Sequence, residues 1–347
     1  MSRVAVIGAG AWGTGLAIVL GRKGVHQVRL WALEEEVQAS IADRRLNDRF
    51  LPGCLIPPGV AVTGDLERAL QGAQFVVSVT PSHHCRRLFQ EMSAFLRPDM
   101  LFVSATKGLE EQSLLRMSAV IASVLESYRG FQPRIGALSG PTFAKEVARG
   151  DPTAITIASV DTELAEIVQG EFSDPSFRVY TNSDIIGVEL GGALKNIIAI
   201  AAGVCDGLGL GYNSTAALIT RGLAEITRLV VACGGRQETM AGLAGLGDLV
   251  LTCTGGLSRN RSVGVELGRG RKLAAIIEGM RGMVAEGVFT TRAAVELARA
   301  HKVEMPITAQ MNAILYHGKS PRDAIQELMT RSGKSETVLV QAESGDG

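Results

Sequence analysis

The chain has 347 residues with 35 basic and 35 acidic side chains, so its zero net charge offers no general attraction for nucleic acid or an anionic membrane. Hydrophobic residues make up 46% of it, enough to bury a core in about two domains. Five dispersed cysteines without a CxxC pair argue against disulfides and metal sites, and no leader or run of about 18 apolar residues is present. We therefore expect a cytoplasmic protein without a membrane span.

The first half of the chain alternates between strand-like and helix-like patterns. The strand-like runs are "RVAVIG", "QVRLW", "VAVTG", "QFVVSV", "MLFVSA", "RIGALSG", "TAITIAS" and "FRVYT", with helical patterns at 66–71, 86–95 and 114–128. Such alternation predicts a parallel sheet covered by helices on both faces. Ligands of these folds bind at the carboxyl ends of the strands.

A glycine-rich turn follows the first predicted strand. "GAGAWG" places Gly8, Gly10 and Gly13 in the GxGxxG spacing, directly before a helical pattern. The first glycine permits a tight turn, the second lets a pyrophosphate approach, and the third allows close helix packing. We interpret the turn as a dinucleotide site, since its position fits better than that of a simple packing turn.

The end of the second predicted strand leaves the choice between NAD and NADP open. An acidic residue there would bind the ribose of NAD, and a basic residue would bind the 2′-phosphate of NADP. "VRLWALEEEV" offers Leu33, then Glu34 and Glu35, which either accept from a hydroxyl or begin the next helix. Arg44 and Arg45 are close in sequence, but two adjacent arginines are more typical of a solvated surface.

Two later loops have the composition of anion-binding sites. "SATKGLE" places Lys107 after the fifth strand, and "LSGPTFAKEV" places Gly140, Pro141 and Thr142 before a helix. Lys145, one turn into that helix, is expected in solvent. "TPSHHCRR" contains adjacent histidines whose side chains would point apart, so we interpret it as a loop and helix start.

The second half of the chain is predicted to be helical, and glycine-rich interruptions such as "GLAGLGD" are expected to be loops or helix ends. The fold class is therefore α/β, with an N-terminal Rossmann-type dinucleotide-binding domain and a C-terminal all-helical substrate domain. We expect these domains at 1–189 and 190–333, followed by a flexible tail at 334–347.

One lysine stands in the apolar helix pattern "GVELGGALKNIIAIAAG". Gly191 and Gly192 precede Lys195 by one turn, so the helix face beside its ammonium group is bare. Poor solvation would lower the pKa of this lysine toward the range of a general acid or base. The alternative is a lysine that reaches water, with glycines that serve helix packing.

Polar residues cluster in "GLAGLGDLVLTCTGGLSRNR". Asp248 and Thr252 are four residues apart, so they share one face of a helix and could orient Lys195. Arg259 with Asn260 is a candidate phosphate clamp, because guanidinium binds phosphate in a bidentate manner. Ser258 and Arg261 fit a helix cap and a surface residue better.

Taken together, these motifs resemble one known family. The segments "GAGAWGT", "SATKGLE", "LSGPTFAKEV", "GVELGGALKNIIAIAAG", "ITRGLAE", "AGLGDLVLTCT", "SRNR" and "VAEGVFTT" occur in that order. The sequence closely resembles the bacterial-type soluble NAD(P)-dependent glycerol-3-phosphate dehydrogenases. The resemblance implies reversible reduction of dihydroxyacetone phosphate to sn-glycerol 3-phosphate for phospholipid synthesis, NAD or NADP as cofactor, and a homodimer.

The resemblance also implies roles for individual residues. The catalytic group is Lys195, Asp248 and Thr252. Cofactor contacts are Gly8, Gly10, Ala11, Trp12, Gly13, Lys107, Ala144, Arg259, Val284 and Glu286. Substrate contacts are Lys107, Gly140, Thr142, Lys195, Asn196, Asp248, Ser258, Arg259 and Asn260.

One position departs from the family pattern, and one rival interpretation stands beside it. Relatives often carry a basic residue where this chain has Ala32 and Leu33, which makes NAD use more credible. The rival is a related two-domain NAD(P)-dependent hydroxy-acid dehydrogenase, whose substrate carries a carboxylate in place of the phosphate.

Overall fold

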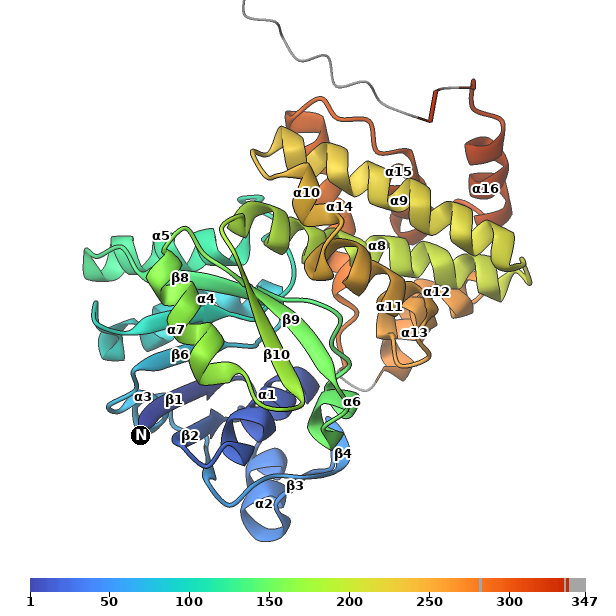
Figure 1. Cartoon of the computed structure of the whole chain (residues 1–347). Coiled ribbons are helices and arrows are strands. Elements are labelled where there is room, and N and C mark those ends of the chain that lie inside the picture. Colours follow the sequence, from blue (N-terminus) through green and yellow to red (C-terminus); the bar gives the residue numbers. More distant parts are fainter. Residues whose placement is uncertain (281–282, 334, 337–347) are drawn as a thin grey trace, which may run out of the picture.

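An eight-stranded sheet forms the first lobe of the computed structural model, which describes residues 1–280, 283–333 and 335–336 (Figure 1). Its strands are β1 (Ser2–Ile7), β2 (His26–Trp31), β5 (Val60–Thr63), β6 (Phe75–Ser78), β7 (Leu101–Ser104), β8 (Arg134–Ser139), β9 (Thr153–Ala158) and β10 (Phe177–Asn182). Their order across the sheet is β10-β9-β8-β7-β6-β1-β2-β5. Each lies where the sequence predicts a strand, so the predicted Rossmann-type lobe is confirmed.

The prediction of a wholly parallel sheet is wrong at one pair. β9 runs antiparallel to β8, while the other pairs are parallel. The link between them contains only the short helix α6 (Ala144–Arg149), which packs against α1 (Ala11–Arg22). A parallel connection must carry the chain back across the sheet. Because α6 stays beside α1, the chain re-enters the sheet in the opposite direction.

Helices cover both faces of this sheet. They are α1, α2 (Glu35–Arg44), α3 (Leu66–Leu70), α4 (Cys85–Met92), α5 (Met117–Arg129), α6 and α7 (Thr162–Phe172). On one face, Leu16 and Phe172 pack in a hydrophobic core with Ile157 of β9. On the other face, Phe89 and Ile121 pack in a second core with Phe102 of β7. The "TPSHHCRR" segment forms a short 3-10 turn (Ser82–His84) and the start of α4, as predicted.

A small hairpin beside the glycine turn was not predicted. It consists of β3 (Leu46–Asn47) and β4 (Leu51–Leu55). The fully buried amide of Asn47 donates to the carbonyl oxygen of Ala9 and to the hydroxyl of Thr14, each at 2.8 Å. The hairpin therefore supports the turn between β1 and α1.

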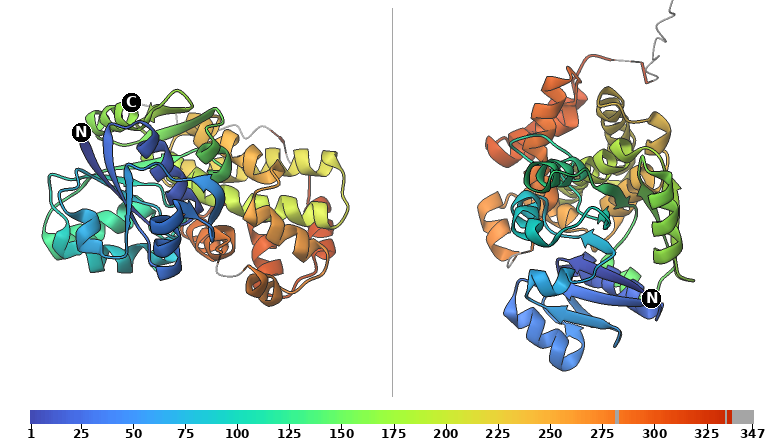
Figure 2. Two further views of the ribbon diagram at one scale, coloured as in Figure 1. Left: turned by 90° about the horizontal axis from the view of Figure 1, so that it is seen from below. Right: turned by 90° about the vertical axis from the view of Figure 1, so that its left-hand side faces the viewer.

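The second lobe is helical and lies beside the sheet lobe (Figure 2). It contains α8 (Ile185–Gly207), α9 (Tyr212–Ala232), α10 (Gln237–Met240), α11 (Asp248–Thr254), α12 (Arg259–Gly268), α13 (Leu273–Gly279), α14 (Glu286–Ala300), α15 (Pro306–Tyr316) and α16 (Pro321–Met329). The segment Leu243–Gly247, expected as a loop or a helix end, is a π-helical turn at the start of α11. Its glycines permit that wide turn, which continues directly into α11.

α8 is the central helix of this lobe. It is long and apolar enough to pass a composition test for a membrane span, as does the bent segment Gln237–Thr254 with Arg259–Gly268. However, 89% of the apolar window of α8 is buried inside the protein. A helix that is apolar on all sides fits such a buried position. We therefore assign α8 as a core helix.

The proposed domain boundary at 189–190 falls inside α8, shortly after its first residue Ile185. We keep the division into 1–189 and 190–333 as a proposal. The proposed tail at 334–347 lies outside the described residues, except for 335 and 336.

α8 and α12 approach each other through glycines on both helices. A β-carbon on Gly264 of α12 would overlap the carbonyl oxygen of Ile200, and one on Gly203 of α8 would overlap that of Arg261. Gly207 and Gly268 repeat this arrangement one turn further along. The backbones are thus in direct contact, which holds the first turn of α12 beside the middle of α8.

Substitution of Gly264 by alanine is predicted to lower the free energy of unfolding by about 2 kcal/mol, because the overlap falls on rigid backbone. Urea denaturation monitored by circular dichroism measures this change. Gly170 of α7 is the matched control, since a β-carbon there meets open space. An equal loss of stability in Gly170→Ala and Gly264→Ala would contradict the role of the close approach.

Candidate active site

The carboxylate of Asp248 joins two lysines from different parts of the chain. Its Oδ1 accepts from Nζ of Lys195 at 2.6 Å, and its Oδ2 accepts from Nζ of Lys107 at 2.6 Å. Thr252, one turn later on α11, accepts a second hydrogen bond from Lys195 at 2.6 Å. The residues predicted from three separate motifs therefore form one connected cluster.

Burial sets the acidity of Lys195. Only 6% of the residue is exposed, on the fully buried part of α8. Desolvation lowers its pKa to about 8, with repulsion from Lys107 adding to this effect and attraction by Asp248 opposing it. The predicted poor solvation of this lysine is thus confirmed.

The glycines before Lys195 serve protein packing. A β-carbon on Gly192 would lie 2.5 Å from the hydroxyl of Ser139, and one on Gly191 would lie 3.0 Å from the carbonyl oxygen of Ala244. The bare helix face is therefore filled by β8 and by the turn before α11. This contact brings the carboxyl end of β8 against Lys195.

The loops after β7 and β8 meet at Lys107. Its Nζ also donates to the carbonyl oxygen of Gly140 at 3.1 Å. Gly140 has φ +159° and lies against Ile155, so a side chain there would be crowded. Thr142 donates to the same carbonyl oxygen at 3.3 Å. These predicted substrate contacts lie together, and Lys145 is exposed as expected.

The first turn of α12 presents Arg259. Ser258 is the N-cap, and its hydroxyl accepts from the backbone N–H of Arg261 at 3.2 Å, as the helix-cap interpretation predicts. Arg259 reaches solvent, yet desolvation lowers its pKa while Glu286 opposes that shift. This combination is expected of a cation in the wall of a concave surface.

Asn260 ties three helices together. Its side-chain Nδ2 donates to Oδ1 of Asn196 on α8 at 2.9 Å, and its side-chain Oδ1 accepts from the backbone N–H of Gly287 on α14 at 2.9 Å. Both residues are buried. The substrate contacts expected for Asn196 and Asn260 remain predictions, since the pair also has this structural function.

The glycine turn has the shape that a dinucleotide needs. A β-carbon on Gly8 would lie 2.6 Å from the carbonyl oxygen of Val79, whereas one on Gly10 would point into open space. Gly13 packs so closely that a β-carbon would overlap the carbonyl oxygen of Gly8. Gly10 is also the N-cap of α1, where free N–H groups attract phosphate. The turn therefore fits a pyrophosphate.

The turn is connected to the lysine cluster through the carboxyl ends of the strands. The N–H of Thr80, beside Val79, donates to the hydroxyl of Thr106 at 3.2 Å, and Lys107 follows Thr106. This bond links the chain beside the glycine turn to the residue that precedes Lys107.

The remaining predicted cofactor residues lie on several elements, and their contacts with a cofactor stay predictions. Ala11 opens α1, and Ala144 lies against Gly15 of that helix. Trp12 packs on Phe177 with 6.5 Å between ring centroids, and its indole N–H has no hydrogen bond in the described part of the chain. Val284 is half-buried just before α14.

Glu286 has a partner that the sequence did not reveal. Its carboxylate accepts from the hydroxyl of Ser82 at 2.6 Å and from the N–H of Ser82 at 3.1 Å. Burial raises the pKa of Glu286, and these hydrogen bonds oppose the shift. Next to them, the rings of His83 and Phe289 are 4.9 Å apart. No sequence motif links these positions, which lie on different lobes.

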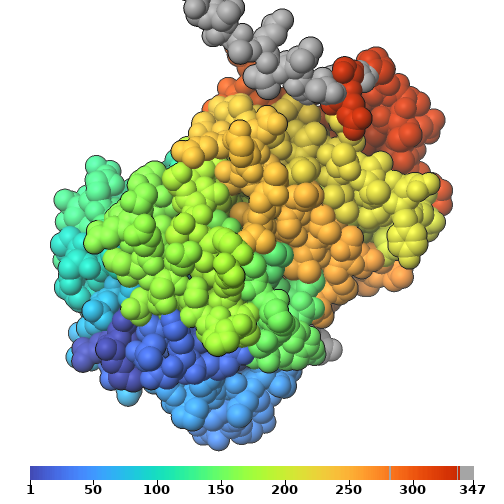
Figure 3. Space-filling model, in the orientation of Figure 1, coloured from blue at the N-terminus to red at the C-terminus, as the bar shows by residue number. Residues whose placement is uncertain are grey.

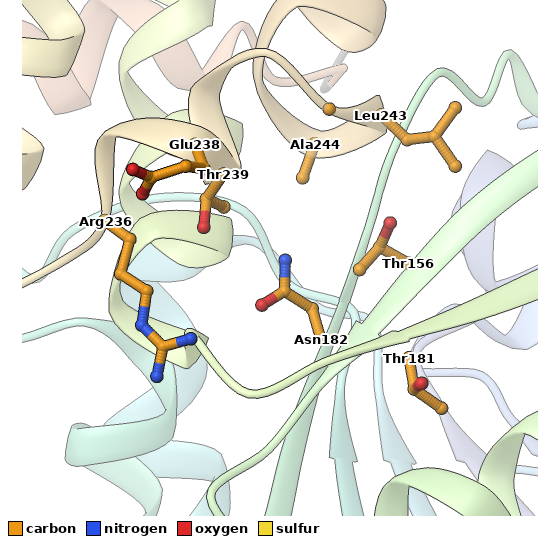
Figure 4. Close-up of a pocket in the computed structure, with 9 residues that line it drawn as sticks. Thr156, Thr181, Asn182, Arg236, Glu238, Thr239, Leu243 and Ala244 are labelled. Atoms are coloured by element: carbon orange, nitrogen blue, oxygen red, sulfur yellow. The ribbon is translucent and has the colours of Figure 1, made fainter.

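A separate cavity of about 220 Å³ lies between the lobes, where the surface is hollowed (Figure 3). Figure 4 shows Thr156, Thr181 and Asn182 from the sheet on one side and Arg236 and Glu238 on the other. It contains none of the predicted site residues. Its wall includes Ala244, in the turn that leads to Asp248.

Comparison with known proteins decides the family. The family model for the N-terminus of NAD-dependent glycerol-3-phosphate dehydrogenase matches residues 3–165, and the model for its C-terminus matches residues 184–326. The chain belongs to this family. The resemblance inferred from the motifs is therefore confirmed.

Individual relatives agree with this glycerol-3-phosphate dehydrogenase assignment. The glycerol-3-phosphate dehydrogenase [NAD(P)+] of Koribacter versatilis is 70% identical over 98% of this chain and 100% of its own length. The crystal structure of the glycerol-3-phosphate dehydrogenase from Coxiella burnetii covers 95% of this chain and 99% of its own, with 42% identity and a TM-score of 0.90. The enzyme from Saccharomyces cerevisiae has 27% identity and a TM-score of 0.77, with 94% and 98% covered.

As a glycerol-3-phosphate dehydrogenase, the protein is an oxidoreductase of lipid metabolism that uses NAD or NADP and acts on a small molecule. A ketopantoate reductase from Ralstonia eutropha, at 18% identity and a TM-score of 0.57, shares the fold alone. The match to the glycerol-3-phosphate dehydrogenase family models and relatives thus favours glycerol 3-phosphate over the rival hydroxy-acid substrate.

Replacement of Asp248 by asparagine is predicted to lower the pKa of Lys195 below about 8, because the charge that stabilises its ammonium form is removed. Nitrogen-detected NMR of the labelled lysine side chains follows this titration. The control is Asp206→Asn, which removes a carboxylate that pairs with Arg261 at 2.8 Å instead of with a lysine. A Lys195 pKa that stays at its wild-type value in Asp248→Asn would contradict the electrostatic coupling.

Proposed function

We propose that this enzyme reversibly reduces dihydroxyacetone phosphate to sn-glycerol 3-phosphate, with Lys195 as general acid and base, and so supplies glycerophospholipid synthesis. The observation that carries this proposal is a buried lysine with a pKa of about 8, held by Asp248 and Thr252. Lys195 lies close to Lys107, which follows the carboxyl end of β7. Ligands of this fold bind at the carboxyl ends of the strands. We also propose a cytoplasmic homodimer, on the basis of the family resemblance.

In the proposed mechanism, Nζ of Lys195 transfers the proton in both directions of the reaction. In the ammonium form, Nζ donates a proton to the substrate oxygen as negative charge develops there, and in the reverse direction neutral Nζ accepts it. Asp248 and Thr252 accept from Nζ and hold it in one orientation. Lys107 shares the same carboxylate and adds positive potential beside the developing oxyanion.

The phosphate of the substrate is assigned to the first turn of α12. Arg259 presents two parallel N–H groups to phosphate oxygens, and the N-terminus of α12 adds favourable dipoles. Ser258, Asn260 and Asn196 hold this turn against α8. Gly140 and Thr142, which are linked to Lys107 by hydrogen bonds, would provide further substrate contacts.

The dinucleotide is assigned to the glycine turn. Gly8, Gly10, Ala11, Trp12 and Gly13 would hold its pyrophosphate half. Lys107, Ala144, Arg259, Val284 and Glu286 would line the path toward the substrate. The bound nicotinamide supplies or accepts the hydride.

The proposal predicts that the protein oxidises NADH or NADPH with dihydroxyacetone phosphate as acceptor. The rate of reduction should fall as pH rises through about 8, because Lys195 loses the proton it donates, and the rate of glycerol 3-phosphate oxidation should rise. Lys195→Met should lower kcat by about a thousandfold while NADH binding persists. Absorbance at the nicotinamide band measures each rate.

Lys145→Met is the control for this experiment, since Lys145 is exposed on α6. A panel of hydroxy acids tests the rival substrate class. Turnover of those acids without turnover of dihydroxyacetone phosphate would refute the proposed substrate, and wild-type kcat in Lys195→Met would refute the proposed acid.

Arg259→Ala is predicted to raise KM for dihydroxyacetone phosphate by about tenfold to a hundredfold, because a charge-assisted hydrogen bond to phosphate is lost. Arg261→Ala is its matched control: this neighbour pairs with Asp206 at 2.8 Å. Steady-state kinetics at saturating NADH separates KM from kcat. An unchanged KM in Arg259→Ala would exclude the phosphate clamp.

A further inference from the structure

We infer that Ser82 is a positioning residue for this reaction, which acts through Glu286 to hold the start of α14 against the sheet lobe. The inference rests on the proposed function, because that function places the substrate beside Lys195 and Arg259 of the helical lobe. Ser82 lies outside the set of residues to which the family resemblance assigns a role.

The contact between Ser82 and Glu286 joins the two lobes. Ser82 is 2% exposed and belongs to the short turn after β6, and Glu286 is the first residue of α14. The Ser82 hydroxyl donates to Oε2 of Glu286 at 2.6 Å, and the backbone N–H of Ser82 donates to Oε1 at 3.1 Å. Each carboxylate oxygen therefore has its own donor from one residue, which fixes the orientation of the carboxylate.

On the sheet lobe, this contact lies against the loop that carries Lys107. A β-carbon on Gly108, the next residue, would lie 2.5 Å from the β-carbon of Ser82 and 3.3 Å from Oε2 of Glu286. The backbone after Lys107 is therefore packed directly against both partners. A change in the contact between Ser82 and Glu286 thus reaches this loop without an intervening layer of atoms.

On the helical lobe, the second residue of α14 is packed against both of the helices that carry the proposed substrate contacts. The N–H of Gly287 donates to Oδ1 of Asn260 at 2.9 Å, and a β-carbon on Gly287 would lie 2.6 Å from the carbonyl oxygen of Asn196. Asn196 directly follows Lys195, and Asn260 directly follows Arg259. The start of α14 therefore contacts the sequence neighbours of the proposed acid and of the proposed phosphate clamp.

Glu286 also acts on Arg259 by charge. Burial lowers the pKa of Arg259, and attraction by Glu286 opposes this shift. In turn, burial raises the pKa of Glu286, and the hydrogen bonds from Ser82 and the charge of Arg259 oppose that shift. The carboxylate that Ser82 orients therefore stabilises the guanidinium of the proposed phosphate clamp.

The first two residues of α14 thus form a junction between the parts of the site. The residues that follow Lys107, Lys195 and Arg259 in sequence each lie against one of them. Without the bond from Ser82, the substrate groups of the helical lobe would lose their fixed position relative to the sheet lobe. A misplacement of about 1 Å can lower a rate by about a hundredfold. Loss of this bond is therefore expected to slow the reaction.

Ser82→Ala tests the inference directly, because it removes the hydroxyl donor and leaves the backbone donor. We expect kcat/KM for dihydroxyacetone phosphate at saturating NADH to fall by about tenfold. Isothermal titration calorimetry with the full chain measures Kd for NADH, which should stay within about twofold of wild type, because the glycine turn lies in the sheet lobe. A wild-type kcat/KM, or a loss of NADH binding as large as the loss of kcat/KM, would overturn the inference.

A double-mutant cycle tests whether Ser82 acts through Glu286. If it does, Ser82→Ala should cause no additional loss of kcat/KM in the Glu286→Ala background, because the acceptor is already absent. Losses that multiply in the double variant would mean that the two residues act independently, and would contradict the inference.

Ser2→Ala is the matched control. The Ser2 hydroxyl donates to Oε2 of Glu171 at 3.0 Å within the sheet lobe, at the amino end of β1, whereas the glycine turn follows the carboxyl end. Its kcat/KM should equal that of wild type, and a loss as large as in Ser82→Ala would contradict a specific role of Ser82. Should Ser82→Ala fail to fold, as judged by circular dichroism, Ser82→Cys fills the space with a weaker donor and should lower kcat/KM in the same direction.

The outcomes separate this inference from the proposed function. Turnover of dihydroxyacetone phosphate that Ser82→Ala leaves unchanged would refute the positioning role and leave the reaction standing. Turnover of a hydroxy acid without turnover of dihydroxyacetone phosphate would refute the proposed substrate, and the same variants then test Ser82 with that hydroxy acid. Absence of turnover with every substrate would refute both.

Discussion

The carboxylate of Asp248 is the contact on which the candidate site depends. One oxygen holds Lys195 from α8, the other holds Lys107 from the loop after β7, and Asp248 itself opens α11. A single buried carboxylate is thus bonded to two lysines, and its removal would leave a buried positive charge without a partner. Burial lowers the pKa of Lys195 to about 8, and the attraction by Asp248 limits this shift.

Backbone contacts through glycine bring the parts of the site to their places. Gly192 admits Ser139 against α8, and Gly264 admits the backbone of α8 against α12. Side chains at these positions would separate the helices by an additional layer of atoms. The first turn of α12, with Arg259, would then move away from Lys195, so the geometry of the site depends on residues that carry no chemistry.

The two lobes contribute different parts of the recognition that we propose. The sheet lobe offers the glycine turn and Lys107, whereas the helical lobe offers Lys195 and Arg259. Contacts between the lobes, such as Ser82 with Glu286, bring these parts together. Substrate and cofactor would therefore meet only where both lobes contribute.

The sequence by itself determined the strand and helix pattern and the glycine turn, because each depends on local periodicity or spacing, and its ordered motifs indicated the family. It left open whether Lys195 is buried or reaches water, which the structure decides. Only the tertiary structure decided which groups meet. The antiparallel β9, the π-helical turn before Asp248 and the Ser82–Glu286 contact arise from packing between segments far apart in the chain. Likewise, "DRRLNDR" does not reveal that Arg45 bonds to backbone carbonyls and that Arg49 pairs with Glu36. Such partners are chosen by three-dimensional proximity, which no spacing along the chain encodes.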